Sequence, residues 1–195
     1  MSAKLPDEKR SDADFPHPPT EAQPEARESR LAWRRAATET RAVLRQASAA
    51  WARHSCPGTA ECCQLAVTKR PPWLWPSEWK VLEARLAREK RPRPALRADG
   101  ACPFLDGSGK RCTVYEDRPL GCRTFFCHRI TGPSKLPAEE TNELLERLKA
   151  LNLEADDEAT PRSILRWVSP LPDPLPLPTP SPPGALPRGE RGTVG

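Results

Sequence analysis

The chain has 195 residues, a formal net charge of +5 and 25 prolines, and hydrophobic residues make up only 37% of it. This length suits one domain, but proline at this density removes backbone donors and fixes φ, so part of the chain is not expected to pack. No apolar run approaches the ~20 residues that span a bilayer, and the N-terminus shows no apolar signal-peptide core. We therefore expect a cytoplasmic protein with no membrane partner.

The charge is unevenly distributed. Residues 1–28 are acidic and residues 169–195 are neutral, so residues 29–168 carry the whole basic excess. A nucleic-acid partner is one explanation for a basic domain. A second explanation is that arginines lying among the cysteines offset the negative charge of thiolates around a metal. We favour the second explanation and do not expect a nucleic-acid partner.

Residues 1–28 are polar and lack periodicity, which predicts a disordered tail. From about residue 28 to residue 54, apolar residues recur at alternating spacings of four and three, which predicts an amphipathic helix. We expect this helix to cover the cysteines and to deliver Cys56. Its buried stripe is predicted to hold Trp33, Ala37, Thr40, Leu44, Ala47 and Trp51.

The next stretch, HSCPGTAECCQL, holds Cys56, Cys62 and Cys63 in a tight loop that opens with a Pro-Gly pair. Adjacent cysteines usually cannot both turn toward one tetrahedral ion without distortion. Either one of the pair faces the core, or the centre holds more than one metal atom. His54 and His128 are candidate nitrogen ligands, although a histidine beside a cysteine is more often only a neighbour.

The pattern of residues 77–90 predicts a second helix. Ser77 is its expected N-cap, and Trp79, Leu82 and Leu86 are expected to face inward. The prolines that follow, at positions 92 and 94, would end it.

Residues 101–129 are expected to form the centre of the domain, with Cys102, Cys112, Cys122 and Cys127. An extended run, a cluster of turn residues at 106–109 and a β-branched and aromatic run predict a short β-hairpin that brings the first two cysteines together. A proline at position 119 suits the first turn of a helix that would carry Cys122. Thiols from two strands and a helix would then converge on one point.

Two further helices are expected. Pro137 would open a long one, whose apolar face holds Leu144, Leu145, Leu148 and Leu151. Thr160 and Pro161 suit the N-cap and first position of a short helix through Ile164, Leu165 and Val168. Residues 169–195 are predicted to be a disordered proline-rich tail, because nine of the eighteen residues from 170 to 187 are proline.

The seven cysteines point to a metal site. An odd number of cysteines without a secretory signal argues against a disulfide framework. Thiolates are soft donors that suit zinc and iron–sulfur centres, but the chain has no C-x2-C pair to choose between the two metals. Seven thiols slightly exceed what one zinc ion needs, which favours iron or an iron–sulfur cluster.

The ordered cysteine motifs resemble a known family. CPFL at 102–105, CTVY at 112–115 and RPLGCRTF at 118–125 follow the pattern CxFL, CxIY and RPxxCRxF of the YkgJ-like, or CxxCxxCC, family of zinc- or iron-chelating proteins. Cys56, Cys62 and Cys63 fall in register with the family's first motif, but Thr59 replaces its second cysteine. Thr59 is either an ordinary loop residue or the mark of an open coordination position. Cys127 lies outside the pattern and is either a ligand or a buried apolar residue.

These observations predict a mainly helical α+β fold: a small cysteine-rich domain over residues 29–168 with a short hairpin, flanked by disordered tails at 1–28 and 169–195. The expected partner is a metal ion, zinc or iron, bound singly or as an iron–sulfur cluster. No catalytic motif is present, which argues against an enzyme without deciding the question. The resemblance implies an iron–sulfur oxidoreductase or electron carrier as the alternative, and a nucleic-acid-binding zinc module is a third. The predicted ligands are Cys56, Cys62, Cys63, Cys102, Cys112, Cys122 and Cys127.

Overall fold

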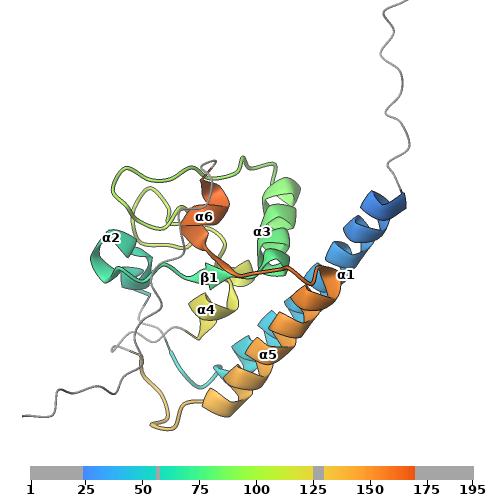
Figure 1. The fold of residues 1–195 in the computed structure, drawn as a ribbon. Helices are drawn as coiled ribbons and strands as arrows, with labels where there is room; N and C mark the ends of the chain where they lie inside the picture. Colours follow the sequence, from blue (N-terminus) through green and yellow to red (C-terminus); the bar gives the residue numbers. More distant parts are fainter. Residues whose placement is uncertain (1–23, 56–57, 125–129, 170–195) are drawn as a thin grey trace, which may run out of the picture.

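The computed structural model describes residues 24–55, 58–124 and 130–169 (Figure 1). This part of the chain is mainly helical and has one small antiparallel sheet, so the predicted mainly helical α+β class is confirmed. The helices are α1 (Pro24–Ala50), α2 (Leu65–Thr68), α3 (Pro76–Arg88), α4 (Leu120–Arg123), α5 (Ala138–Ala155) and α6 (Ile164–Val168). The 3-10 turns are η1 (Glu61–Cys63) and η2 (Tyr115–Asp117), and the strands are β1 (Trp73–Leu74) and β2 (Arg162–Ser163).

The two long helices, α1 and α5, lie side by side and run in opposite directions (Figure 1). Arg35, in the first half of α1, pairs with Glu154 at the end of α5. Near the other end of the helix pair, Arg147 Nη1 donates to Gln46 Oε1 at 3.0 Å. Both contacts are exposed, so they contribute little, and the apolar faces between the helices hold the pair together.

Helix α3 lies between two hydrophobic cores. Val81 faces the first core, which is built mainly from α1 and α5. Trp79, Leu82 and Leu86 face the second core, as predicted, and are fully or nearly fully buried. The second core also contains Cys102 and is packed by Cys63 and Cys112. Helix α3 therefore forms a wall shared by a helical frame and a cysteine-bearing half.

Three buried polar side chains meet where α1, α3 and α5 cross. Thr40 Oγ1 lies 2.8 Å from Ser77 Oγ, and Asn152 Nδ2 donates to the same Ser77 oxygen at 2.9 Å. The Asn152 amide oxygen accepts the Ser77 backbone N–H at 2.9 Å. The prediction that Ser77 caps α3 is wrong, because the N-cap is Trp75 and the Ser77 side chain is committed to this cluster.

The sheet joins two segments that are far apart in the chain. β1 and β2 pair antiparallel, with Trp73 opposite Ser163 and Leu74 opposite Arg162. The short helix predicted from position 161 therefore begins later, at Ile164, because the two residues before it are extended in the sheet. Ile164 and Val168 are buried, as expected.

The predicted hairpin is present in reduced form. One antiparallel bridge joins Leu105 to Cys112, and the Thr113 N–H donates to the Phe104 carbonyl at 2.8 Å. The β-branched and aromatic run at residues 111–115 was expected to form the second strand, but it instead enters η2 at Tyr115. The hairpin still brings the Cys102 and Cys112 segments together.

Other boundaries shift by a few residues. α1 begins at Pro24, earlier than predicted, and ends at Ala50, and residues 24–28 are helical rather than part of the predicted tail. On α5, Leu148 is fully buried but Leu145 is 44% exposed, so its predicted place on the inner face is wrong. The remaining tail residues lie outside the described ranges. Within those ranges, no helix has the length and apolar character to span a membrane.

Candidate metal centre

Five cysteines reach one cavity from four separate parts of the chain. Cys62 and Cys63 lie in η1, Cys102 follows α3, Cys112 lies at the hairpin bridge and Cys122 lies on α4. All five line a cavity of about 580 Å³. Thiols from the hairpin, the following helix and the double cysteine of η1 thus share one cavity, and their convergence on a single metal stays a prediction.

The first three thiols form a chain of hydrogen bonds. The Cys62 thiol bonds the Cys63 sulfur, and the Cys63 thiol bonds the Cys102 sulfur. Donation to the next sulfur, together with burial, raises the pKa of Cys63 to about 12 and the pKa of Cys62 further above its usual range. The backbone supports the same arrangement, since the Cys102 N–H donates to the Cys63 carbonyl at 2.7 Å.

Cys112 and Cys122 lie close enough to interact electrostatically with each other and with Cys62 and Cys63. Burial, and then the neighbouring thiols, raise the pKa of Cys122 above its usual range. Burial also raises the pKa of Cys112, and the charge of Arg118 opposes this shift. Without a metal, Cys62, Cys63, Cys112 and Cys122 are therefore neutral thiols, and a metal ion must displace their protons in order to bind.

Five basic side chains line the same cavity. Arg118 is the most directly placed, because its charge acts on both Cys62 and Cys112 and its guanidinium stacks 3.9 Å from the centre of the Tyr115 ring. Within the described part of the chain, none of the five forms an ion pair with a carboxylate. Positive charge without a carboxylate partner offsets thiolate charge when a metal binds. The five are Arg70, Lys110, Arg111, Arg118 and Arg123.

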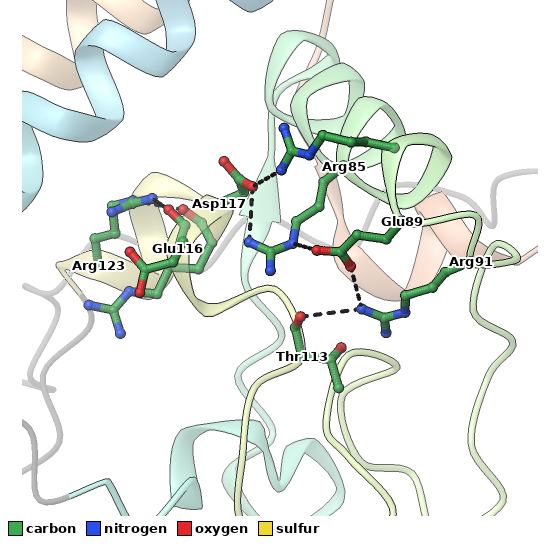
Figure 2. Close-up of polar contacts among 9 residues, drawn as sticks. Arg85, Glu89, Arg91, Thr113, Glu116, Asp117 and Arg123 are labelled. Carbon is green, nitrogen blue, oxygen red and sulfur yellow. Dashed lines mark hydrogen bonds and ion pairs between the residues drawn. The ribbon is translucent and has the colours of Figure 1, made fainter.

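An ion-pair network from the end of α3 holds the irregular segment that leads into α4 (Figure 2). Arg85 lies between two carboxylates, with Glu89 Oε1 at 2.9 Å and Asp117 Oδ2 at 3.1 Å. Arg91 contacts the Glu89 carboxylate at 3.1 Å and the Thr113 carbonyl at 3.3 Å. The segment from Thr113 to Pro119 has one 3-10 turn, η2, as its regular structure. Ion pairs and hydrogen bonds from side chains at the end of α3 therefore fix its position.

A buried carboxylate fixes α4 itself. Glu78 is only 2% exposed, and its Oε2 accepts the Trp75 N–H at 2.8 Å, which caps α3. The other oxygen caps α4, the helix that carries Cys122. Burial raises the pKa of Glu78 to about 7, although two backbone hydrogen bonds and the charge of Arg123 oppose the shift.

Sequence reasoning missed Glu78. A glutamate three residues after the N-cap is the acidic half of a capping box, so this pattern was the available signal. The second partner of Glu78 is the Leu120 N–H, 42 residues later. No local sequence pattern indicates a contact at that separation.

Cys56 and Cys127, the other two predicted ligands, lie outside the described residues. The described residues that flank them in the sequence are nevertheless connected by backbone hydrogen bonds. Ser55, which directly precedes Cys56, forms an antiparallel bridge with Thr131, which follows Cys127 in the sequence. The Ser55 N–H donates to the Thr131 carbonyl at 2.8 Å, and the reciprocal bond is 3.1 Å. Thr59, the residue at the missing cysteine position, also lines the cavity.

The donor set fits zinc or iron in its chemistry, and the five cysteines share one cavity. Soft thiolates are the preferred ligands of both zinc and iron–sulfur centres, and five thiols that could supply them line one cavity together with five basic side chains. Among residues 24–55, 58–124 and 130–169, no three Cys, His, Asp or Glu side chains already stand grouped closely enough to hold an ion. A complete coordination sphere therefore requires that these side chains move closer together or that the rest of the chain supplies ligands.

Fold and cavity together define a small, mainly helical domain with a cysteine-lined cavity. A family model matches residues 55–157, which is more than half of the chain: the CxxCxxCC family, described as "Putative zinc- or iron-chelating domain". The chain belongs to this family, which confirms the resemblance seen in the cysteine motifs. Neither the curated proteins nor the solved structures contain a match to the chain.

Proposed function

We propose that this protein is a cytosolic metal-chelating protein that holds zinc or iron, singly or as an iron–sulfur cluster, through its cysteine cluster. The proposed ligands come from Cys62, Cys63, Cys102, Cys112 and Cys122, with Cys56 and Cys127 from outside the described residues. The observation that carries the proposal is the convergence of five thiols from four chain segments on one cavity. Family membership supports zinc or iron as the metal.

The thiol hydrogen-bond chain supports this role over simple packing. A cysteine that only fills space acts as a small hydrophobe and needs no thiol partner. Here Cys62 is hydrogen-bonded to Cys63 and Cys63 to Cys102, and Arg118 places positive charge beside Cys62. Loss of the thiol protons would convert this chain directly into a set of adjacent soft anionic donors.

The number of thiols favours iron as the metal. A mononuclear zinc site needs four ligands, and five thiols already line the cavity. A cavity of about 580 Å³ also has room for more than a single ion. An iron–sulfur centre would make the protein an electron carrier or oxidoreductase, which is the second candidate function.

Metal analysis of full-length protein purified without oxygen tests the proposal. We expect zinc or iron in stoichiometric amount. Visible absorption that bleaches on reduction identifies an iron–sulfur cluster, and a colourless zinc-containing protein identifies a zinc site. Cys122→Ser and Cys63→Ser should each reduce the metal content or speed metal release.

Ala101→Ser is the matched control. It places a serine hydroxyl at a buried position beside Cys102 without removing a thiol, so it should keep the metal. Wild-type protein without metal, or cysteine variants that hold metal as tightly as Ala101→Ser, would contradict the proposal.

A further inference from the structure

His54 lies at the edge of the same cavity and is the one described histidine. Its ring is held from several sides. The Trp51 ring packs against it with centroids 4.9 Å apart, and its Nε2 lies 3.3 Å from the Pro133 carbonyl oxygen. The ring therefore occupies a defined position although no helix or strand carries it.

Gly132 contributes to this position. Its φ is +146°, and a Cβ atom placed there would lie 2.9 Å from the His54 Cδ2 and 2.7 Å from the Arg53 carbonyl oxygen. Any side chain at this position would collide with the ring or the backbone. The loop can approach the imidazole this closely only because the residue is glycine.

The contact with Pro133 selects one tautomer of the neutral His54 ring. A carbonyl oxygen only accepts hydrogen bonds, so Nε2 is the protonated nitrogen and, in the neutral ring, Nδ1 carries the lone pair. Nδ1 is buried and has no hydrogen-bond partner in the described part of the chain. A buried acceptor without a partner is costly, and a metal ion is a partner that would satisfy it.

We propose that His54 Nδ1 is a nitrogen ligand of the metal, which makes the centre a mixed cysteine–histidine site. This inference rests on the proposed function. A metal-bound histidine usually donates its other ring N–H to a carboxylate or a backbone carbonyl, and the His54–Pro133 contact already has this form. Imidazole nitrogen suits zinc and iron alike.

Two substitutions separate a ligand from a structural residue. In His54→Gln, the side-chain amide can still donate to the Pro133 carbonyl from near the Nε2 position, but no atom replaces the Nδ1 lone pair. In His54→Asn, the amide lies near the Nδ1 position and the contact with Pro133 is lost. His17→Gln is the matched control, because it removes a histidine from residues outside the described ranges.

The experiment uses full-length protein loaded with zinc and follows release to a competing chelator. His54→Gln should release zinc at least tenfold faster than wild type, with unchanged unfolding of the metal-free protein. His17→Gln should release zinc at the wild-type rate. In cobalt-substituted protein, His54→Gln should also shift the visible ligand-field bands, since a nitrogen donor is lost.

Two results would overturn the assignment. The first is wild-type release and unchanged cobalt bands in His54→Gln. The second is loss of metal in His54→Asn alone, which would assign His54 to holding Pro133 and its loop. If wild-type protein holds metal and Cys122→Ser loses it while His54→Gln does not, this inference fails and the proposed function stands. If wild-type protein holds no metal, both fail.

Discussion

Glu78 and Leu120 are 42 residues apart in the chain, yet the Glu78 Oε1 accepts the Leu120 backbone N–H at 2.7 Å. Leu120 is the first residue of α4 and has no side-chain cap of its own, since a proline precedes it. The other carboxylate oxygen of Glu78 accepts the Trp75 N–H, so this one carboxylate caps both α3 and α4. The position of the Cys122 helix is thus set from α3.

Glu78→Ala should destabilise the metal-free protein by about 2–4 kcal/mol, because it leaves two buried backbone N–H groups without acceptors. Urea unfolding at about pH 5 measures this effect, since at that pH the carboxyl is mainly protonated and relief of a buried charge does not offset the loss. Glu143→Ala removes an exposed glutamate from α5 and should change the free energy of unfolding little. Equal effects of the two variants would contradict the double cap.

Stability should fall as the pH rises toward neutrality. Burial raises the pKa of Glu78 from about 4.5 to about 7, so the folded state holds the proton more tightly than the unfolded state. The protonated Glu78 carboxyl therefore stabilises the folded state fully below about pH 4.5. This contribution, about 3 kcal/mol, is lost as the pH rises through about 7. The measurement is the pH dependence of the unfolding free energy of wild type relative to Glu78→Gln. A difference that is flat over this range would show that the carboxyl is ionised throughout.

Metal removal should lower the melting temperature and change the tryptophan emission, because a structural metal contributes on the order of 10 kcal/mol in small domains. The change should come mainly from Trp51, which lines the cavity, and from Trp79, which shares a core with Cys102. Trp33 lies on α1 of the helical frame and should report little. In Trp33→Phe the emission change should therefore persist, and in Trp51→Phe it should shrink. A metal-free protein with wild-type melting and emission would show that the metal is peripheral.

Thr59→Cys should slow metal release, because Thr59 lines the cavity with the five thiols and a thiolate is a far better donor than a hydroxyl. Slower release would mean that an open coordination position has been closed. Thr68→Cys is the control, since it adds a thiol nearby but outside the cavity lining. If Thr59→Cys releases metal at the wild-type rate while Cys127→Ser releases it faster, Thr59 is an ordinary loop residue and Cys127 supplies the ligand.

The long helices could be predicted from the sequence because their signals are local. Ala37, Thr40, Leu44 and Ala47 recur at helical spacing and are all buried on α1. Their ends were less well predicted. Ser77 has the chemistry of a cap, but its hydroxyl is taken by Thr40 and Asn152, and a contact with a helix 75 residues later has no local signal.

The sheet and the details of the metal centre could not be predicted for the same reason. β1 and β2 are two residues each and pair Trp73 with Ser163, so neither has a recognisable strand pattern. The cysteine set was predicted as a group from the ordered motifs. The thiol hydrogen-bond chain depends on how three loops pack, and the assignment of all seven cysteines as ligands stays a prediction.

The order of elements along the chain places every cysteine between α1 and α5, the two helices that pack against each other to form the frame. During synthesis, α1 leaves the ribosome before the first cysteine, and α5 follows after the last. The frame can therefore close only once all seven thiols have been made. A partly synthesised chain would expose its early cysteines without the helix pair that positions them, so correct metal loading should come after translation of α5.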